Sequence, residues 1–540
     1  MIPIGIDLGT TYSCVSVWNT ETESIVVIPN EEGQNTTPSV CAWNENEIII
    51  GSKAKQMIPN YGEVKRFMGR TIEEVKDIIH PYQICSDETN QSILIKIRNH
   101  WISPIEISSY LLKQFKRDAE RYLQQPVTQA VITVPAYFGE LQREATKFAG
   151  ELAGLEVLRV IPEPTAAALA YYQEYQKQIN DIHYILVYDW GGGTLDVSVL
   201  SMEGGVVEVL AIAGDSFLGG EDIDQILMVQ IWNLWAQRLQ LPSTNPDHYV
   251  APKLSEDQIN YFKLAVEKAK RKLSIDKIVK LEWEPEEQKE EVKKPFWITR
   301  HQFEEWCHSI FDRAMIPVEE VMLLIKVPIH EIIMVGGSTR IPIIQEQLRR
   351  RFSDIPVHHK IHPDECVAIG AGIQAALLAG IRSKSLEDVL LLDVLPFSLG
   401  VETVGGIMTR LLERNTTLPV NYKQIFTTNE DEQETVEIQI YQGERIFVKD
   451  NILLGSFTLE GIPPAQRGVP RIEVSLNVNG NGILNVTAYE QISNQKRTIR
   501  IRANTNFISE SEQKRLIQEA EQQKEEDEKQ VNLINENLST

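Results

Sequence analysis

The sequence predicts a chain of several domains: an α/β region at 1–385, an antiparallel β-sandwich at 396–507 and a short helical segment at 508–540. Two observations predict this division. Strand-like and helix-like patterns alternate through the first region, which is typical of an α/β fold. Apolar and polar residues then alternate one by one, which is typical of strands with one buried face. The 540 residues suffice for three or four folding units at about 150 residues each.

The β-sandwich prediction rests on short segments of strict alternation. Apolar residues occupy every second position in 435–441 and again in 471–478. The run Asn-Gly-Asn-Gly at 479–482 then predicts a hairpin turn before a further strand at 483–488. Paired strands of this kind favour an antiparallel sheet with one face toward a core.

Two short segments flank the predicted β-sandwich. The linker at 386–395 contains the run Asp-Val-Leu-Leu-Leu-Asp. It is interpreted as an ordinary buried strand or, alternatively, as an apolar connector that docks in one state and is released in another. The sequence alone does not favour the second interpretation. At the other end, Ser509 and Glu512 form a capping box that predicts the start of the helical tail.

Charge and cysteine content exclude several classes of protein. The 53 basic and 76 acidic residues give a net charge of −23. An acidic surface repels phosphate backbones, so we expect no nucleic-acid partner. The five cysteines are far apart and include no Cys-x-x-Cys pair: Cys14, Cys41, Cys85, Cys307 and Cys366. This pattern argues against a disulfide framework and against a cysteine zinc site, and it fits a reducing compartment.

The sequence shows no targeting or membrane signal. The first fifty residues contain no Lys or Arg, whereas secretory and mitochondrial presequences need early positive charge. The longest nearly apolar run, 368–381, is too short to span a bilayer. Within it, the small residues Gly370 and Gly372 are expected to permit close helix packing. We expect a cytoplasmic monomer without a membrane partner.

One internal repeat points to a function. The segment 4–11 is echoed by 187–194, and both contain a strand, an aspartate and a Gly/Thr turn. Backbone N–H groups of such turns hold phosphate, and an aspartate at the strand end holds Mg²⁺ through its waters. A single copy would be an ordinary hairpin. The repeat favours two similar lobes that face one cleft, with Asp7 and Asp189 at equivalent positions.

Two further segments are compatible with a nucleotide. Gly336, Gly337 and Ser338 follow a strand and precede a helix, so their amides form either an anion site or a plain corner. The helix that begins at Ser255 places four polar residues on one face: Glu267, Lys270, Arg271 and Ser274. That face is either solvated or the wall of a nucleoside pocket. No Gly-Lys dipeptide occurs, so a Walker A loop is excluded.

These segments resemble signatures of the seventy-kilodalton heat-shock chaperones, the DnaK family. The matching runs are IGIDLGTTYS (4–13), VITVPAYF (131–138), EPTAAALAY (163–171), YDWGGGTLDVS (188–198), GDSFLGGEDID (214–224), MVGGSTRIP (334–342), DVLLLDVLPFSLGVET (388–403) and YQGER (441–445). The resemblance extends to about residue 507. The segment ERNTTLPV at 413–420 and the shortened helical end are similar to the HscC-like branch of that family.

The resemblance implies an actin-like ATPase domain with a duplicated ribonuclease H-like fold, a docking linker, a peptide-binding β-sandwich and a truncated helical lid. It also implies ATP or ADP, Mg²⁺ and K⁺ as bound species. Catalytic roles are implied for Asp7, Lys65, Glu163, Asp189 and Thr194. Asp7 and Asp189 would hold hydrated Mg²⁺, Lys65 would reach the γ-phosphate, and Glu163 would order the attacking water.

The resemblance also implies which residues contact the nucleotide. Contacts to phosphate and to the monovalent cation are implied for Thr10, Thr11, Tyr12, Gly191, Gly192, Gly193 and Asp196. The adenosine pocket would be formed by Gly219, Gly220, Glu267, Lys270, Arg271, Ser274, Gly336, Gly337, Ser338, Arg340, Ile341 and Asp364. The helix-face argument and the resemblance therefore agree on the residues from Glu267 to Ser274.

A peptide site in the β-sandwich is implied as well. Its residues would be Val401, Thr403, Val404, Phe426, Asn429, Val436, Ile438, Ile472 and Val474. An extended peptide would bind there by main-chain hydrogen bonds and one buried aliphatic side chain. The alternative is that these residues are only sandwich core, because inward-facing residues of alternating strands are core by default.

The sequence departs from the family pattern at three places. Asn429 is polar where a small apolar residue is common, so a different substrate preference is expected. Pro162 stands where the family has Asn, on a surface that resembles the docking site of J-domain co-chaperones, so we expect a specialised or weakened J-protein partner. The shortened lid predicts fast peptide release. The sequence predicts an ATP-driven chaperone of unfolded proteins with a nucleotide exchange factor as partner. The alternatives are an ATP-binding, weakly cycling regulator of another chaperone and, less favoured, a sugar kinase.

Overall fold

The computed structural model describes residues 2–44, 47–76, 82–87, 92–175, 181–239, 256–282, 296–358, 361–383, 386, 389–480, 482–492 and 496–500. Several predictions fall elsewhere in the chain. The helical tail at 508–540, Ser255 at the expected helix start, Asp388 of the linker and Asn481 of the hairpin lie outside the described residues.

Two sheets with one topology form the α/β region. The first follows the order β11-β10-β1-β2-β3, with β4 paired to β2. In it β1, β2 and β3 are antiparallel, whereas β10 and β11 run parallel to β1. The bounds are β1 (Pro3–Asp7), β2 (Tyr12–Asn19), β3 (Ser24–Ile28), β4 (Thr36–Pro38), β10 (Gln129–Val134) and β11 (Glu156–Pro162).

The second sheet repeats this order as β18-β17-β12-β13-β14, with β19 added at the β14 edge. Its first three strands in the chain are again antiparallel, and β17 and β18 are again parallel to β12. The repeated strand order matches the repeat found in the sequence. The bounds are β12 (His183–Trp190), β13 (Leu195–Glu203), β14 (Val206–Asp215), β17 (Glu331–Val335), β18 (Val357–His358) and β19 (Leu390–Leu392).

Two helices join the sheets. Helix α12 (Cys366–Leu378) packs on β1 and β2 of the first sheet, and α5 (Glu163–Tyr175) packs on β12, β13 and β14 of the second. The two helices also pack on each other. A Cβ on Gly370 would lie 1.8 Å from the carbonyl oxygen of Ala166, and one on Gly372 would lie 2.2 Å from Ser16 Oγ. The small residues of this run therefore permit close packing, as the sequence predicts.

The remaining elements surround the two sheets. The first lobe carries β5 (Cys41–Trp43), β6 (Ile48–Ile50), α1 (Ser52–Lys55), the 3-10 helix η1 (Val64–Phe67), α2 (Ile72–Val75), β7 (Ile84–Ser86), β8 (Ile93–Ile97), β9 (His100–Ile102), α3 (Pro104–Leu123) and α4 (Glu140–Leu152). The second lobe carries α6 (Gly220–Leu239), α7 (Glu256–Leu273), β15 (Ile278–Lys280), β16 (Trp297–Thr299), α8 (Arg300–Trp306), α9 (His308–Arg313), α10 (Ile316–Leu324), η4 (Gly337–Arg340) and α11 (Pro342–Arg351).

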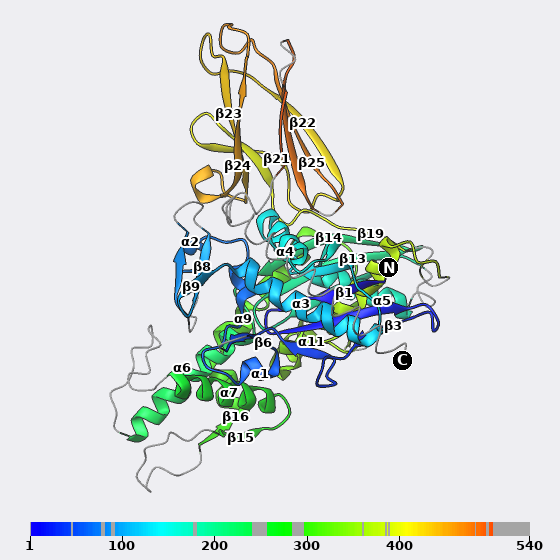
Figure 1. Ribbon diagram of the computed structural model, residues 1–540, viewed down its shortest axis with the longest axis vertical. Coiled ribbons are helices and arrows are strands. Elements are labelled where there is room, and N and C mark those ends of the chain that lie inside the picture. Colours follow the sequence, from blue (N-terminus) through cyan, green and yellow to red (C-terminus); the bar gives the residue numbers. More distant parts are fainter. Residues whose placement is uncertain are drawn as a thin grey trace.

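Two antiparallel sheets of four strands form the β-rich region. Their orders are β21-β20-β23-β24 and β22-β25-β26-β27. Both sheets contribute to one apolar core, for example through Ile440, Leu459, Leu476 and Val486. Figure 1 shows this region at one end of the molecule, next to α4 and β19. The bounds are β20 (Leu399–Thr403), β21 (Ile407–Leu412), β22 (Val420–Phe426), β23 (Thr435–Gln442), η5 (Val448–Asp450), β24 (Ile452–Glu460), β25 (Ile472–Val478), β26 (Leu484–Glu490) and β27 (Lys496–Arg500).

The segment predicted as a linker joins the second sheet in this conformation. Strand β19 pairs in parallel with β14, and the amide of Leu390 donates to the carbonyl of Gly205 at 2.8 Å. Its side chains alternate, because Leu391 is 7% exposed and Leu390 is 55% exposed. This segment is thus a partly buried edge strand here, which is compatible with both interpretations of its sequence.

Candidate functional site

The two Gly/Thr turns contact each other between the lobes. A Cβ on Gly192 would lie 2.4 Å from Thr11 Oγ1, and one on Gly193 would lie 2.6 Å from Thr10 Cγ2. Distances below 3.0 Å exclude a side chain at both positions unless the threonines move. Glycine therefore sets the approach of the two turns. The structure brings together the residues of both turns that the sequence predicts as phosphate ligands.

Three aspartates lie buried at the ends of the strands that flank these turns. Asp7 ends β1 and accepts a hydrogen bond from Thr133 Oγ1 at 3.0 Å. Asp189 and Asp196 face each other across the β12–β13 pair, and Asp196 Oδ1 accepts from the Tyr137 amide at 3.2 Å. Each copy of the repeat thus places an aspartate carboxylate beside the contact between the two turns.

The buried surroundings of these carboxylates contain too little positive charge to balance them. Burial, followed by the Glu163 carboxylate, raises the pKa of Asp7 to about 7 and that of Asp196 to about 8. The same two causes raise the pKa of Asp189 well above its ordinary value. The buried Oδ2 atoms of Asp189 and Asp196 have no hydrogen-bond partner. Orphaned carboxylate oxygens in one place are the donor set that a hydrated cation would satisfy.

Lys65 and Glu163 lie beside the aspartates. Lys65, in η1, is 5% exposed, and its Nζ lies 2.5 Å from Glu163 Oε1 and donates to the carbonyl of Leu8. Glu163 is the first residue of α5. The Lys65 ammonium lowers the pKa of Asp7, which partly offsets the effect of burial. One ammonium and four carboxyl groups thus surround the contact between the turns.

The predicted adenosine residues form two groups. The first is centred on Ser338, whose Oγ donates to the carbonyl of Gly191 at 2.7 Å. Lys270 Nζ donates to the carbonyl of Gly220 at 2.7 Å and lies 2.6 Å from Asp224. A Cβ on Gly219 would meet Gly192 at 2.3 Å. These contacts connect the first turn of α6 to the second Gly/Thr turn.

Other predicted adenosine residues extend the first group. Arg340 forms an ion pair with Asp364 at 2.7 Å, and a Cβ on Gly337 would lie 3.6 Å from Asp364 Oδ1. Gly336 adopts φ 81°, where a Cβ would meet the Trp190 carbonyl at 2.4 Å. Ile341 is buried, and Ser274 is half-buried just beyond α7.

The second group centres on Tyr12. The Tyr12 hydroxyl accepts from Lys55 Nζ at 3.3 Å and from Arg271 Nη1 at 3.5 Å, and Lys55 pairs with Glu267 at 2.8 Å. Beside this group lies a cavity of about 330 Å³, lined by Lys55, Leu264, Glu267, Lys268, Arg271, Lys272 and Ile275. Only Glu267 and Arg271 of the predicted adenosine residues line it. Sequence reasoning missed Lys55, because the contact spans 212 residues.

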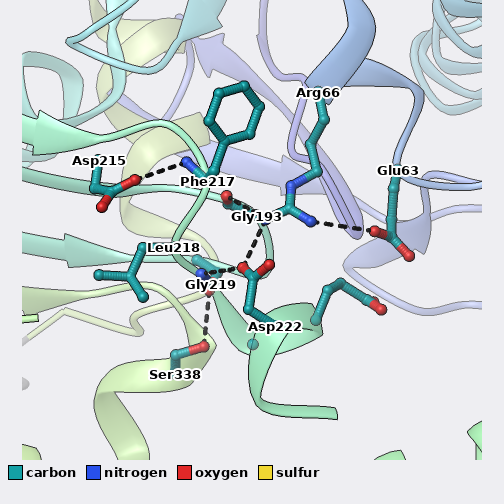
Figure 2. Close-up of polar contacts among 12 residues, drawn as sticks. Glu63, Arg66, Gly193, Asp215, Phe217, Leu218, Gly219, Asp222 and Ser338 are labelled. Atoms are coloured by element: carbon teal, nitrogen blue, oxygen red, sulfur yellow. Dashed lines mark hydrogen bonds and ion pairs between the residues drawn. The ribbon is translucent and has the colours of Figure 1, made fainter. Parts of the chain in front are cut away.

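The sequence also gave no sign of the charged residues around Arg66. Arg66 follows Lys65 directly, and its guanidinium contacts Gly193 and Asp222 of the second lobe (Figure 2). The one sequence feature that could have indicated a role for Arg66 is its position next to Lys65. The partners of Arg66 lie 127 and 156 residues away, so no local pattern predicts them.

The predicted peptide residues divide by burial. Val401, Ile438, Ile472 and Val474 are between 1% and 5% exposed and belong to the apolar core of the β-rich region. Phe426 and Val436 pack against that core. Thr403 Oγ1 lies 3.0 Å from Thr409 Oγ1 at the end of β20. Val404 is 74% exposed, and Asn429 is exposed and bonded through its amide to Gln433.

Pro162, which lies in the predicted J-protein contact, is buried in this conformation. Pro162 ends β11, where it pairs with Val134 of β10, and it is buried. Its ring therefore presents no docking surface in this conformation. The sequence could not reveal this, because burial at a strand end depends on packing from distant segments. Nearby Arg159 instead donates to the carbonyl of Gly480 in the β-rich region at 2.8 Å.

Within the described ranges, no three His, Cys, Asp or Glu side chains converge so as to hold a metal ion directly. A hydrated ion held through water would need fewer direct ligands. In the same part of the chain, no helix combines the length and the apolar character that crossing a bilayer requires.

A duplicated sheet with facing Gly/Thr turns, joined through an edge strand to an all-β unit, defines a two-lobed class of α/β protein. The family model described as "Hsp70 protein" matches residues 3–539. The chain is 41% identical to heat shock cognate 70 kDa protein 3 of Dictyostelium discoideum, over 99% of this chain and 85% of that protein. It is 43% identical to chaperone protein dnaK of Cyanidioschyzon merolae, over 97% and 86%. It is 42% identical to chaperone protein DnaK of Anaplasma marginale, over 97% and 80%. The chain belongs to the Hsp70 family.

Proposed function

We propose that the chain is an ATP-dependent molecular chaperone that binds extended hydrophobic segments of unfolded proteins. Hydrolysis in the two-lobed region would switch peptide affinity through the linker. The observation that carries this proposal is the place of β19. It extends the same sheet whose strands β12 and β13 deliver Asp189 and Asp196. A change at the Gly/Thr turns therefore has a continuous sheet through which it can reach the linker.

The domain boundaries follow the same proposal. Residues 1–385 would form an actin-like ATPase domain with a duplicated ribonuclease H-like fold, which the repeated strand order supports. Residues 386–395 would be the linker, 396–507 the β-sandwich, and 508–540 a helical lid segment. The two sheets of the β-rich region, which share one core, support the assignment of a sandwich.

The arrangement of charges fits ATP hydrolysis. Lys65 is positioned to neutralise charge that develops on the transferred phosphoryl group, and its pairing with Glu163 fixes the ammonium. Glu163 would orient the attacking water, and the Thr194 hydroxyl would hold a phosphate oxygen. The amides of the two Gly/Thr turns would bind the remaining phosphate oxygens from both sides.

Mg²⁺ is proposed at the buried aspartates. Its residues would be Asp7 and Asp189, which would bind the waters of the hydrated ion, and Asp196 would contribute to a K⁺ site. The orphaned Oδ2 atoms of Asp189 and Asp196 support this assignment. When bound, the ion supplies charge that neutralises the phosphates. The chain's own residues hold the ion's waters and fix the triphosphate between the turns.

Nucleoside and peptide would bind at opposite ends of the molecule. The adenosine would lie among the residues gathered around Ser338 and those around Glu267 and Arg271. The peptide would cross the β-sandwich near Thr403 and Val404, with an aliphatic side chain in the pocket formed by Val401, Phe426, Val436, Ile438, Ile472 and Val474. The exposure of Val404 supports a contact from outside the core. The same side chains can belong to the core of the β-rich region and also form the wall of the peptide pocket.

The proposal also includes partner proteins and a cellular compartment. A J-domain protein would stimulate hydrolysis, and an exchange factor would separate the lobes to release ADP. Pro162 would alter the J-domain contact only in a conformation that exposes it. The wide spacing and odd number of the cysteines support a reducing compartment such as the cytoplasm.

The first test is steady-state ATP hydrolysis with and without an extended, Leu-rich peptide. We expect stimulation by the peptide, and we expect Lys65→Ala to lose at least about a hundredfold in hydrolysis, because a buried charge that acts on the transferred group is removed. ATP binding by this variant, measured by calorimetry, should persist. Tight ATP binding with no response to peptide in the unmodified chain would contradict a coupled chaperone cycle.

A further inference from the structure

Three of the ten histidines gather at one end of the second sheet, away from the aspartate group. His183 is the first residue of β12, His330 directly precedes β17, and His358 is the last residue of β18. Asp189 lies near the opposite end of β12. The proposed function gives these three imidazoles no role.

His330 connects β12 and β17 by a reciprocal pair of hydrogen bonds. The His330 amide donates to the carbonyl of Tyr184 at 2.8 Å, and the Tyr184 amide donates to His330 Nδ1 at 2.8 Å. The regular pairing of the two strands begins one residue later, between Ile185 and Glu331. The imidazole therefore takes the place of a backbone carbonyl and extends the sheet beyond its first regular pair.

The second of these bonds exists only while His330 is neutral. A backbone N–H can only donate, so the Nδ1 atom that accepts from Tyr184 must carry a lone pair. In the imidazolium form both ring nitrogens carry a proton, which would set two donors against each other. Protonation of His330 therefore breaks the bond and leaves the Tyr184 amide without this acceptor.

The surroundings of His330 oppose that proton. Its ring stacks with those of His183 and Tyr184, at centroid distances of 5.1 and 5.6 Å and interplanar angles of 17° and 20°. Two imidazolium rings at such a distance would repel each other. Burial, followed by the charge of His183, lowers the pKa of His330 below its ordinary value of 6.5.

Glu331 holds the neighbouring side chains in position. Its Oε2 lies 3.5 Å from His183 Nε2 and also accepts a hydrogen bond from the Tyr171 hydroxyl. Its Oε1 lies 3.1 Å from His358 Nε2. One carboxylate thus faces β12, β18 and α5. The titratable groups around it and around His330 include His183 and Tyr184 from β12, His358 from β18, and Tyr171 and Tyr175 from α5.

The strand β19 pairs at the same end of this sheet. His183 pairs with Met202 of β13, and Met202 pairs with Val207 of β14. Val207 pairs in turn with Leu391 of β19. Each residue of this row lies at a strand end or one residue from it. Because strand ends are the parts of a sheet that open most easily, release of one of them lowers the cost of opening the next.

Side-chain packing follows the same row. Tyr171, Met202, Val207 and Leu391 belong to one apolar cluster, and none of them is more than 7% exposed. Tyr171 thus reaches Glu331 through its hydroxyl and shares a core with Leu391 through its ring. Close-packed side chains transmit strain to their neighbours. A loss of order at the start of β12 therefore extends toward the place where β19 pairs.

We propose that His330 is an acid-sensitive clasp. The neutral ring fixes the start of β12 to the segment before β17, and the protonated ring lets this end of the sheet open and weakens the pairing of β19 with β14. This inference goes beyond the proposed function, because it adds a control by pH at a site remote from the Gly/Thr turns. Only its effect on hydrolysis rests on the proposed function.

The sign of the pH effect follows from the direction of the pKa shift. The closed clasp favours the neutral imidazole, whereas opening returns His330 to its ordinary pKa. Opening therefore takes up a proton when the pH falls below 6.5. The stabilisation by the clasp is complete above this pH, and it is lost as the pH falls through the lowered pKa of the closed state.

The test is hydrogen exchange of the full chain at pH 7.5 and pH 5.5, corrected for the intrinsic effect of pH on exchange. It is read at the Tyr184 amide and at the amides of 390–392. We expect protection to fall about five- to tenfold at pH 5.5, because this pH lies one unit below the ordinary pKa of one imidazole. The measurement needs no ATP, so its outcome is independent of the proposed function.

Three variants make the test specific. His330→Asn offers an amide oxygen in place of Nδ1, so it keeps an acceptor that cannot be protonated, and its protection should be equal at both pH values. His330→Ala removes the acceptor and should be about fivefold less protected already at pH 7.5. The matched control His308→Asn removes an exposed histidine that pairs with Asp312, and it should behave as the unmodified chain. Thermal unfolding would verify that each variant is folded.

The outcomes separate the clasp from the proposed function. The clasp is refuted if His330→Asn loses protection in acid as the unmodified chain does, or if His330→Ala is fully protected at pH 7.5. Loss of protection at Tyr184 alone would overturn the connection to β19. Stimulation of hydrolysis by a Leu-rich peptide should fall at pH 5.5, and less so in His330→Asn. Exchange as expected without any stimulation would support the clasp and overturn the proposed function.

Discussion

Gly192 and Gly193 set the distance between the two halves of the proposed phosphate site. Their Cβ positions fall 2.4 and 2.6 Å from atoms of Thr11 and Thr10. Neither glycine is required for a left-handed backbone, because no positive φ is recorded for them. Glycine is required at these positions because the space between the two lobes is too small for a side chain. A methyl group here would force the turns apart at the place where a triphosphate would be held from both sides.

We therefore expect Gly193→Ala to weaken nucleotide binding and hydrolysis at least about tenfold, with a loss of stability of about 1–3 kcal/mol from the overpacked contact. Gly480→Ala is the control, because a Cβ there meets nothing within 4 Å and the residue has no positive φ. ATP hydrolysis and thermal unfolding would be measured for both variants. Equal behaviour of the two would show that the close approach of the turns is not needed.

The residues of the candidate site differ in how far sequence predicts them. Asp7 and Asp189 follow from the repeat, since each ends a strand before a Gly/Thr turn. Lys55 and Arg66 do not, because their partners are distant in the chain and a lone basic residue carries no signal of its own. Pro162 was placed on a surface and is buried. Burial is a property of the packed chain, and local composition does not determine it.

Among the elements, β19 is the one whose sequence allowed two interpretations. A run of three leucines fits a strand in any buried setting, and pattern alone does not specify which sheet accepts it. The structure pairs it with β14 in parallel and buries one leucine, Leu391, while Leu390 faces outward. This alternation offers a direct test of the coupling between the domains.

Leu391→Asp should undock the linker, because a carboxylate would replace a side chain whose burial contributes about 1.5–3 kcal/mol. We expect the variant to hydrolyse ATP without stimulation by peptide, and the amides of 390–392 to lose protection from hydrogen exchange. The neighbouring Leu390→Asp, at 55% exposure, should keep both properties. A Leu391→Asp chain that still responds to peptide would argue against communication through β19.

At the scale of the whole molecule, the β-rich region contacts both lobes of the α/β region. The amide of Glu140 donates to Gln442 Oε1 at 3.1 Å, and the Ile212 amide donates to Asn415 Oδ1 at 3.2 Å. The rings of Tyr137 and Phe397 meet at 4.7 Å. The two hydrogen bonds suit reversible contact, since each donor and acceptor could bond to water when the domains part.

The Glu140 carboxyl group makes this interface dependent on pH. Burial raises its pKa to about 8, although Arg143 and the Leu484 amide act in the opposite direction. Docking thus takes up a proton and weakens as the pH rises from the ordinary range of a glutamate through about 8. We expect small-angle scattering to show a larger radius of gyration at pH 9 than at pH 6.

Glu140→Gln should abolish this change in radius, because the amide cannot ionise. Glu151→Gln, on the same helix α4 but with a side chain 49% exposed, should preserve it. A radius that stays constant with pH in the unmodified chain would contradict the role of Glu140. A Glu140→Gln chain that expands as the unmodified chain does would point to another titrating group.

The crossing of α5 and α12 has a consequence for how the two lobes depend on each other. Helix α12 comes from the second half of the α/β region yet covers the first sheet, and α5 comes from the first half yet covers the second sheet. Each lobe is completed by a helix that the other half of the chain supplies, so the halves are reciprocal parts of one folding unit. We expect rotation of one lobe against the other to turn about this pair of helices, which approach closely where Gly370 meets Ala166. The small residues at this contact between α5 and α12 are thus the expected axis of the motion.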